Sequence, residues 1–479
     1  MPLILPGNVA TATAATGYDV ANSVRMNDDD TPYFNKTPSA GDRAKWTFSC
    51  WFKLGNIPGA SSTHGILVSG GASADQSTIR IDGQVIDWVE WDQSGSATQG
   101  RLITNRVFRD PTAWYHLVCT WDSDNGTEGS RMKMYINGVR ETSFSTGTYP
   151  TSGYDSAMNS NVLHEIGRQS WNSSQYFDGY FAEMAFCDGQ AYAASDFGEF
   201  DEDSPTIWKP KDISGLTFGS RGWYLDFEDS GDLDDDESGN GNDWTANNLA
   251  ATDQAVDTPT NNFCTLNPLV RLGAHSTLSE GNCFWTLSSA GYESVHSTFA
   301  VNSGKWYCEF KFISGSHQYT GITASELLTG LYESVISGDS NIMYNHAGNK
   351  QIGNSSDGAA QSSYGSTYTS GDIVGMALDY DNNYMYFAKN NTWQNSGDPE
   401  SGATGTGGLA LPSTTHSYAF GMSKYASGGS GTAGANFGGC PPFSLSSAAN
   451  DENGYGLFEY APPDGFLALC SKNLGSDGG

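Results

Sequence analysis

The sequence has few cations and no long hydrophobic run. Lys and Arg number 23 against 54 Asp and Glu, so the formal net charge is −31. Binding nucleic acid or an anionic membrane surface needs clustered cations, so both partners are disfavoured. No apolar run approaches the roughly 20 residues that cross a bilayer, and the N-terminus lacks the basic region of a secretory signal. The charge favours solubility and mutual repulsion at high copy number.

The eight cysteines form no CxxC pair and show no metal-ligand spacing. Cys50, Cys119 and Cys308 fall on the apolar faces of expected strands, where a cysteine acts as a small hydrophobe. We therefore expect free, buried thiols in a protein made in a reducing cytoplasm. A disulfide such as Cys264–Cys283 stays open, because spacing alone does not fix pairing.

Helical periodicity is missing beyond a turn or two, whereas Gly, Ser, Asn, Thr and aromatic residues are abundant. This composition is typical of many short strands joined by turns. Residues 114–139 predict a hairpin, because apolar residues alternate from Leu117 to Trp121 and Asn137-Gly138 tolerates positive φ in a tight turn. The chain is therefore expected to be all-β, with a length that suits two or three domains.

Other segments alternate in the same way. Residues 46–54 carry an apolar side chain at every second position, which predicts a strand with one buried face in an antiparallel sheet. Residues 304–312 repeat this pattern, and residues 373–387 predict a second hairpin. After Gly179, the expected members of one buried face are Tyr180, Ala182, Met184 and Phe186.

Several of these segments together resemble the laminin-G-like, concanavalin-A-like jelly-roll sandwich. They are WTFSCWFKLG, RDPTAWYH, the hairpin arm ending in YINGV, and FDGYFAEMAFCDGQA, in this order. A later set, GKWYCEFKF, SGDIVGMALDYDNNYMYFAKNNTW, YAFGMS and NFGG, resembles the SPRY domain, although Asn390-Asn391 stands where that family usually has Asn-Gly. The resemblance implies two tandem concanavalin-A-like (jelly-roll) β-sandwiches, laminin-G-like then SPRY-like. SPRY domains bind peptides and proteins through loops, which implies binding and not catalysis.

More narrowly, residues 24–269 resemble a family of bacteriophage virion proteins. The shared segments are VRMNDDD, WTFSCWFK, FDGYFAE, FGE, LDFEDSGDLDDDESGNGNDW and DTPTNNFCTLNPL. The resemblance implies a virion structural protein on the tail or capsid surface, synthesised in the host bacterial cytoplasm. The favoured interpretation is a tail fibre or receptor-binding component that contacts a host cell-surface glycan or protein, as a homo-oligomer such as a trimer. The alternative is a capsid decoration or head-fibre protein that contacts other virion subunits.

The expected domain organisation has four parts. Residues 1–24 form an N-terminal arm, 25–215 the laminin-G-like sandwich, 216–275 an acidic connector and 276–479 the SPRY-like sandwich. The arm is expected either to lie on the first sandwich as a strand or to dock on a neighbouring subunit.

The connector is a candidate cation site. Between Asp226 and Asp243 it holds nine acidic residues and no basic one. Its segment DLDDDESGNGND resembles calcium loops, in which alternating Asp and Asn oxygens surround a hard cation. The EF-hand spacing and its closing glutamate are missing, so a calcium site and a plain solvated turn both stay open. The candidate calcium ligands are Asp234, Asp236, Asn240, Asn242 and Asp243.

Two long loops, 145–161 and 167–179, are rich in aromatic and small polar residues. Rigid rings stack on sugars or protein, while hydroxyls and amides adapt their hydrogen bonds. The alternative is that the rings cap the edge of the sandwich. The candidate ligand-binding residues are Tyr149, Tyr154, Trp171, Asn172 and Tyr176.

Catalytic motifs are absent from the sequence: it has no P-loop, no HExxH and no nucleophile elbow. His116 and His164 stand alone near expected strands, and such histidines are usually structural. A sandwich glycoside hydrolase needs two carboxylates that flank the scissile bond, whereas the strand around Glu183 offers one. A glycoside hydrolase is therefore the least favoured interpretation, and we expect a non-catalytic protein.

Overall fold

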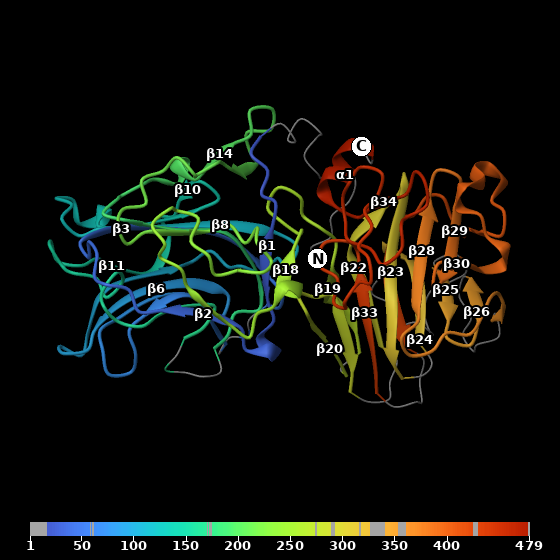
Figure 1. Cartoon of the computed structure of the whole chain (residues 1–479), viewed down its shortest axis with the longest axis horizontal. Coiled ribbons are helices and arrows are strands. Elements are labelled where there is room, and N and C mark those ends of the chain that lie inside the picture. The colour runs from blue at the N-terminus through green and yellow to red at the C-terminus, as the bar shows by residue number, and fades with distance from the viewer. Residues whose placement is uncertain are drawn as a thin grey trace. The chain divides into compact units, whose positions relative to one another are not determined.

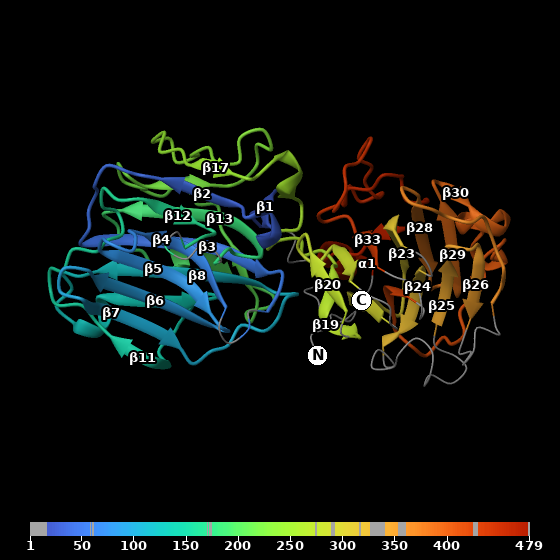
Figure 2. The same cartoon turned by 90° about the horizontal axis from the view of Figure 1, so that it is seen from below.

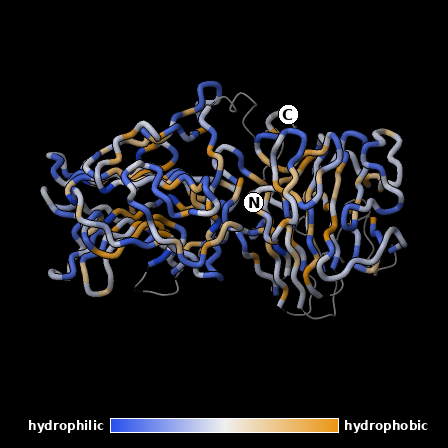
Figure 3. Tube along the Cα trace, in the orientation of Figure 1, coloured by the Kyte–Doolittle hydropathy of each residue, from blue (hydrophilic) through white to orange (hydrophobic). Residues whose placement is uncertain are grey.

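The computed structural model describes residues 17–57, 59, 62–169, 171, 175–273, 275–288, 293–315, 318–325, 341–352, 361–424 and 430–477. In these ranges the regular secondary structure is nearly all strand, and the chain divides into two compact units between Thr260 and Asn261 (Figure 1). Each unit is built from two mainly antiparallel sheets, and hydrophobic residues gather between them (Figure 3). The expectation of an all-β chain with two tandem jelly-roll sandwiches is confirmed.

The first sandwich has a front sheet and a back sheet. The front strands are β1 (Ser23–Met26), β3 (Lys45–Leu54), β8 (Trp114–Asp122), β9 (Met132–Ile136), β10 (Val139–Arg140), β13 (Gly179–Asp188), β16 (Trp223–Leu225) and β18 (Gln254–Ala255). They pair in the order β10-β9-β8-β3-β13-β1-β18, and β16 also pairs with β13. A separate small hairpin consists of β14 (Gly198–Phe200) and β15 (Trp208–Pro210).

The back sheet, whose strands lie side by side in Figure 2, has the order β11-β7-β6-β5-β4-β12-β2-β17. Its strands are β2 (Tyr33–Lys36), β4 (Thr63–Ser69), β5 (Gln76–Asp82), β6 (Val85–Asp92), β7 (Ala97–Thr104), β11 (Phe144–Thr148), β12 (His164–Ile166) and β17 (Thr245–Asn247). Strand β2, which follows β1 in the chain, lies in the opposite sheet.

The predicted hairpin of residues 114–139 is confirmed. In β8 and β9, Leu117 pairs with Ile136 and Trp121 with Met132, and all four side chains lie in the main core. Asn137 has φ 47° and Gly138 φ 77°, the tight-turn geometry that leads into β10. Because alternating residues of a strand share a face, the sequence pattern correctly placed these side chains on one side of the hairpin.

Strand β3 is buried on both faces, where one buried face was expected. Trp46, Phe48 and their alternate neighbours face the main core. The other face is covered by residues 190–224, whose apolar side chains form a second cluster against the front sheet. Thr47 Oγ1 donates to Gln190 O at 2.8 Å, which ties this covering layer to β3. The front sheet therefore lies between two apolar layers.

The expected face of β13 is wrong after Ala182. A β-bulge interrupts the pairing of β13 with β3 between Ala182 and Ala185, and Glu183 has φ 49°. As a result Phe181, Met184 and Phe186 enter the main core. A bulge inserts one residue and reverses which face the following side chains take.

The expected acidic connector 216–275 is divided between the two units. Within residues 216–260, β16 pairs with β13, β17 with β2, and β18 with β1. These three strands are only two or three residues long, but each finds a backbone partner in a sheet, so the segment is part of the first sandwich. Residues 17–24 of the expected arm also belong there, because β1 pairs with β13 and Tyr18 donates to Glu183 at 3.3 Å. The rest of the arm, residues 1–16, lies outside the described residues.

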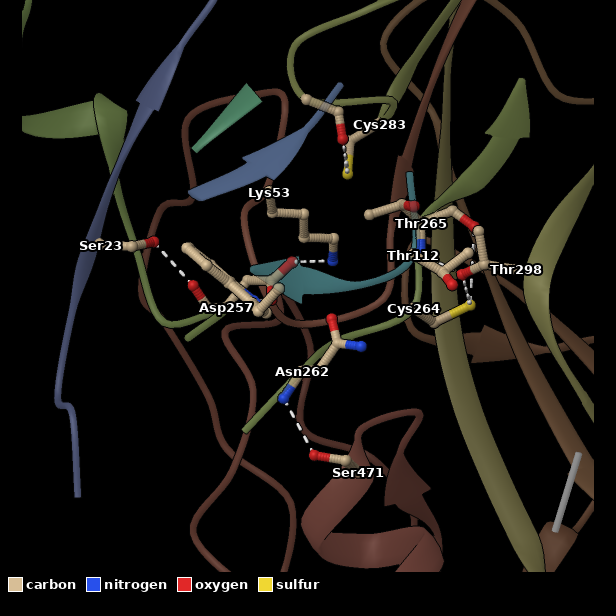
Figure 4. A network of polar contacts seen from close by, with 12 residues as sticks. Ser23, Lys53, Thr112, Asp257, Asn262, Cys264, Thr265, Cys283, Thr298 and Ser471 are labelled. Atoms are coloured by element: carbon tan, nitrogen blue, oxygen red, sulfur yellow. Dashed lines mark hydrogen bonds and ion pairs between the residues drawn. The ribbon is translucent and has the colours of Figure 1, made fainter. Parts of the chain in front are cut away.

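Asp257, in the segment DTPTNNF, anchors that segment to the first sandwich (Figure 4). Its carboxylate accepts from Lys53 Nζ at 2.7 Å and from Trp114 Nε1 at 3.1 Å. Its carbonyl accepts from Ser23 Oγ at 2.6 Å. The Lys53–Asp257 pair is buried, and a buried ion pair needs such extra hydrogen bonds to offset its desolvation.

The second sandwich also has two sheets. One has the order β19-β22-β32-β24-β25-β26-β27, with β19 (Leu266–Leu272), β22 (Glu293–Val301), β24 (Gln318–Ala324), β25 (Asn341–Asn345), β26 (Asn349–Ile352), β27 (Ser362–Ser363) and β32 (Tyr418–Lys424). The other has the order β20-β21-β33-β23-β28-β29-β30, with β20 (Ser276–Ser279), β21 (Phe284–Leu287), β23 (Lys305–Ser314), β28 (Ile373–Asp379), β29 (Tyr384–Lys389), β30 (Thr392–Trp393) and β33 (Gly431–Asn436). Strands β31 (Leu409–Ala410) and β34 (Leu467–Ala468) extend this sheet, and helix α1 (Ser471–Asp477) follows.

The strands predicted in this half of the chain are present with the expected faces. Trp306, Cys308 and Phe310 of β23 lie in its core. Asn390 and Asn391 have φ 46° and 63°, so the pair makes the tight turn between β29 and β30 that Asn-Gly usually makes. Among the described residues, no helix has the length and hydropathy to cross a bilayer.

The eight cysteines are free and buried. Cys264 Sγ accepts from Thr298 Oγ1 at 3.6 Å, and the same hydroxyl accepts from the Thr265 N–H at 3.0 Å (Figure 4). The Cys264–Cys283 disulfide that spacing left open is therefore not formed in this structure.

Candidate functional site

A narrow hollow opens between the two sheets of the first sandwich, and we call it the recess. Its cavity volume is about 10 Å³, room for about one water molecule, so a larger ligand would bind at its mouth and not inside it. Its lining comes from β2, β4 and β12 of the back sheet, from β13 and β16 of the front sheet, and from four loops. The lining residues are Lys36, Pro38, Leu67, Met158, Asn159, His164, Phe186, Arg221, Trp223 and Trp244.

Aromatic rings give the recess a rigid wall. Trp223 stacks on Phe186 with 6.1 Å between ring centroids, and Trp244 meets Trp223 edge-on at 5.0 Å. Both tryptophans are buried. Edge-on and stacked pairs hold rings in fixed orientations, so this wall is formed before any ligand arrives.

Two cations line the recess of this acidic protein. Lys36 Nζ donates to Asn242 O and lies 5.7 Å from the centre of the Trp244 ring. Burial lowers the pKa of Lys36, while the nearby Asp236 and Asp243 act in the opposite direction. Within the described residues, the guanidinium of Arg221 makes no hydrogen bond or ion pair, and its backbone N–H donates to Asp188. Arg221 therefore has its full donor capacity available to a ligand.

His164 is a structural part of the recess wall. Its Nε2 accepts from the Asn159 N–H at 3.1 Å, so Nδ1 carries the proton and donates to Val162 O at 2.8 Å. Burial lowers the pKa of His164 to about 4. The ring is therefore neutral and its two nitrogens are occupied, which agrees with a structural role.

The predicted calcium segment forms a clamp behind the recess. Asn240 Nδ2 donates to the carbonyls of Gly219 (2.8 Å) and Gly222 (3.1 Å). Asn242 Nδ2 donates to Ser220 O at 3.2 Å and also to Gly222 O. The two amides thus hold the turn that carries Arg221.

Asp236 holds the clamp itself in shape. Its carboxylate accepts from three backbone N–H groups, those of Tyr224 (2.9 Å), Ser238 (2.9 Å) and Asn242 (2.8 Å). It also accepts from the Ser238 hydroxyl at 2.9 Å, and the Asp236 side chain is buried. Both carboxylate oxygens are therefore used within the turn.

This arrangement replaces the calcium expectation for Asp234, Asp236, Asn240, Asn242 and Asp243. Asp234 accepts from the Ala246 N–H at 2.6 Å and Asp243 from the Asp236 N–H at 3.3 Å, while the two asparagines act as amide donors. In the described part of the chain, no group of three His, Cys, Asp or Glu side chains could hold a metal ion. Calcium needs six to eight converging oxygens, and here the oxygens bind N–H groups.

We therefore expect chelation to leave the first sandwich unchanged. Its thermal midpoint, measured by differential scanning calorimetry, should be the same in EDTA and in excess calcium, because the clamp uses N–H donors instead of a cation. A calcium-dependent rise in that midpoint would contradict the hydrogen-bonded clamp.

The predicted aromatic binding residues lie away from the recess lining. Tyr149 and Tyr154 are half-buried against the main core, and the Tyr154 ring meets Trp121 edge-on at 6.3 Å. Trp171 is half-buried, and Tyr176 pairs with the backbone of Arg168. Asn172 lies outside the described residues. The four described rings therefore come from two loops, and much of the surface of Tyr149 and Tyr154 is buried by packing against the core.

The loop that carries Tyr149 and Tyr154 nevertheless reaches the recess through Met158 and Asn159. Glu90, fully buried in β6, fixes this loop by accepting from Ser156 Oγ at 2.8 Å and from the Ala157 N–H at 3.2 Å. Burial raises the pKa of Glu90 to about 7. The buried Glu90 carboxyl group therefore holds the loop at Ser156, two residues before Met158, the first lining residue of this loop.

Sequence reasoning missed Lys36, Arg221, Trp223 and Trp244 as site residues. They lie up to 208 positions apart, and no local pattern shows that they meet. Two signals were present. Cations are scarce in this chain, so an isolated Lys or Arg is informative, and a tryptophan flanks the acidic segment on either side.

Comparison with known proteins agrees with the geometry of the first sandwich. Residues 28–194 match the Concanavalin A-like lectin/glucanases superfamily. This concanavalin-A-like region contains β2 to β13, whereas Arg221, Trp223 and Trp244 lie beyond it. The recess is therefore completed by a part of the chain that the family match does not include. No curated protein matches the chain.

Solved structures with similar parts come from several sources. The SPRY domain of human HERC1 is 14% identical with a TM-score of 0.27, and the alignment covers 37% of this chain and 99% of that domain. A putative carbohydrate binding protein from Bacteroides ovatus is 14% identical with a TM-score of 0.30, covering 48% of this chain and 61% of that one. The heptameric SAP-like pentraxin from Limulus polyphemus is 13% identical with a TM-score of 0.28, covering 37% and 80%.

Proposed function

We propose that this chain is a non-catalytic glycan-binding protein of a phage virion, a tail fibre or receptor-binding component whose first sandwich binds a host cell-surface saccharide at the mouth of the recess. The observation that carries the proposal is the recess itself. It combines a preformed aromatic wall with a guanidinium that has no partner among the described residues, inside a sandwich that matches the Concanavalin A-like lectin/glucanases superfamily. Apolar surface with a few convergent polar groups is the usual composition of a small-molecule site.

The lining favours binding over hydrolysis. A glycoside hydrolase places an acid and a second carboxylate on either side of the scissile bond. The ten lining residues of the recess include no Asp or Glu. Glu183, which the sequence offered as a lone carboxylate, is buried under Tyr18 and Tyr224 instead.

The virion role rests on the ordered set of segments shared with phage virion proteins, from VRMNDDD to DTPTNNFCTLNPL. A shallow site on one subunit binds a single saccharide weakly. Repetition over the copies of a fibre raises the apparent affinity without any new contact. The strong negative charge of the chain keeps such closely spaced copies from aggregating.

The test is binding of the full chain, fluorescently labelled, to a bacterial glycan array and to host cells, with unlabelled phage as competitor. Pro38 lines the recess on a loop, so Pro38→Trp should cover the mouth of the recess and abolish binding while the circular dichroism spectrum is unchanged. Ser39→Trp adds the same ring one position along, where the side chain is exposed, and should bind normally. Glycan binding that survives Pro38→Trp would move the site elsewhere, and a chain that binds neither glycan nor cells would overturn the proposal.

A further inference from the structure

We infer that the saccharide recognised by the recess is an acidic one, and that its anionic substituent lies between Arg221 and Lys36. This inference rests on the proposed function and specifies its ligand. The anionic group is a carboxylate, as in a uronic acid, or a phosphate or sulfate ester. These groups share the planar or tetrahedral oxygen acceptors that a guanidinium binds with two N–H donors.

The first observation is the pair of cations. Arg and Lys are outnumbered by acids more than two to one in this chain, and several of the other cations are held in ion pairs. Arg80 and Arg101 both bind Asp87, Arg106 binds Glu141, and Lys53 binds Asp257. Arg221, in contrast, has no acidic partner within the described residues. An unpaired guanidinium beside a partly buried ammonium is an unfavourable arrangement that an anion relieves.

The second observation is that the nearby acids leave the N–H donors of the two cations free. The charges of Asp236 and Asp243 favour the charged form of Lys36, but Asp236 directs its oxygens to the three N–H groups and the Ser238 hydroxyl of the clamp, and Asp243 accepts from the Asp236 N–H. Among the described residues, Lys36 makes one hydrogen bond, to the neutral carbonyl of Asn242. Two donors on Lys36 and all those on Arg221 thus remain for a ligand.

The third observation is preorganisation. The amides of Asn240 and Asn242 fix the turn of Arg221 through the Gly219, Ser220 and Gly222 carbonyls. Lys36 lies against the Trp244 ring, which restricts its side chain. Because these groups are held before binding, less conformational entropy is lost when the anion arrives. The recess has room for about one water molecule, so the anionic substituent contacts the two cations at its mouth and the sugar ring lies outside.

The net charge of −31 does not oppose this assignment at short range. Charges more than about 8 Å apart are largely screened at physiological ionic strength. The chain as a whole therefore slows the approach of an acidic glycan, while the contact with the two cations decides whether it stays.

The experiment compares anionic and neutral glycans on the array, with carboxylate-, phosphate- and sulfate-bearing members scored separately. Binders should be confined to the anionic members. For a carboxylate binder, methyl esterification of the same saccharide should abolish the signal, and added NaCl should weaken it. Which of the three classes binds identifies the source of the anionic group.

The variants are Arg221→Gln and Lys36→Gln, with Arg140→Gln as the matched control. Removal of a charged hydrogen-bond donor should weaken binding of the best anionic glycan roughly ten- to hundred-fold for Arg221→Gln and about ten-fold for Lys36→Gln. Arg140 is exposed on β10 and outside the recess lining, so its variant should bind like the unaltered chain. Melting curves establish that the variants are folded.

The outcomes separate the two proposals. The acidic-ligand inference would be overturned if neutral glycans bound as tightly as acidic ones and if Pro38→Trp removed binding while Arg221→Gln left it intact. The recess would then be a neutral-sugar site. Absence of all glycan and cell binding overturns the proposed function, and the inference with it.

Discussion

Replacing Asp236 with alanine should lower the free energy of unfolding of the first sandwich by roughly 3–5 kcal/mol. Three backbone N–H groups, those of Tyr224, Ser238 and Asn242, would lose their acceptor in a turn where Asp236 is only 6% exposed. Each buried donor left without a partner costs about 1–3 kcal/mol. For a domain of this size the loss corresponds to a fall of about 10 °C in Tm.

The same change should also reduce glycan binding, because Asn242 and the turn of Arg221 depend on the clamp. Asp235→Ala is the matched control. Asp235 is exposed and adjacent, so its loss should change stability by no more than about 0.5 kcal/mol. Calorimetry of the full chain, in which each sandwich can unfold separately, measures the stability of both variants. If the two variants unfolded at the same temperature, the clamp would not be what holds this segment.

The stability of the chain should have its maximum near pH 6.5 and fall on both sides. On the alkaline side the cause is three buried carboxyl groups. Burial raises the pKa of Glu90 to about 7, of Glu183 to about 8 and of Glu309 to about 7. In the unfolded chain these groups ionise near pH 4.5. Between that pH and the pKa of the folded state, the folded chain therefore keeps protons that the unfolded chain has lost. Stability from these groups is complete below pH 4.5 and is lost as the pH rises through 7 and 8.

On the acid side the cause is four buried histidines. Burial lowers the pKa of His64, His164 and His296 to about 4 and that of His116 to about 3. The unfolded chain binds protons at these side chains below pH 6.5, whereas the folded chain does not. Their contribution to stability is therefore complete above pH 6.5 and is lost as the pH falls. Between pH 4.5 and 6.5 the carboxyl and histidine contributions oppose each other.

Denaturant unfolding measured from pH 5 to 9 tests this. Between pH 6.5 and 8 the free energy of unfolding, summed over the two sandwiches, should fall by roughly 3 kcal/mol. Glu90→Gln and Glu183→Gln should flatten the alkaline limb of the first sandwich, and Glu309→Gln that of the second. A surface variant such as Glu202→Gln, at an exposed position, should leave the curve unchanged in shape. Stability that rises from pH 6.5 to 8 would contradict the assignment of these three carboxyl groups.

Where residues alternate without interruption, the sequence was sufficient to predict the strands and their faces. In β8, β9 and β23 each apolar residue takes the face that the period of two assigns it. The prediction failed in β13, because Ala182, Glu183 and Met184 continue the alternation through a bulge that appears only when β13 pairs with β3. The geometry of that pairing, and not the local sequence, decides which face Met184 takes.

The site was less predictable than the fold. The segment DESGNGND was considered both as a plain solvated turn and as a calcium site, the latter because Asp and Asn oxygens dominate calcium loops. The structure uses the asparagine nitrogens instead, as donors to the turn of Arg221. Which end of an amide is used depends on the partner that the fold supplies. The meeting of Lys36, Arg221 and Trp244 is likewise a product of the sheet order.

The burial of β3 on both faces restricts how this sequence can change over evolutionary time. In a two-layer sandwich, every second position of a strand faces water and accepts most polar residues. From Trp46 to Leu54 no side chain of β3 is exposed, and the covering layer of residues 190–224 has to change in step with the strand beneath it. Sequence variation among relatives of this protein is therefore expected to be concentrated in the loops around the recess. There, new binding specificities can arise without repacking either apolar layer.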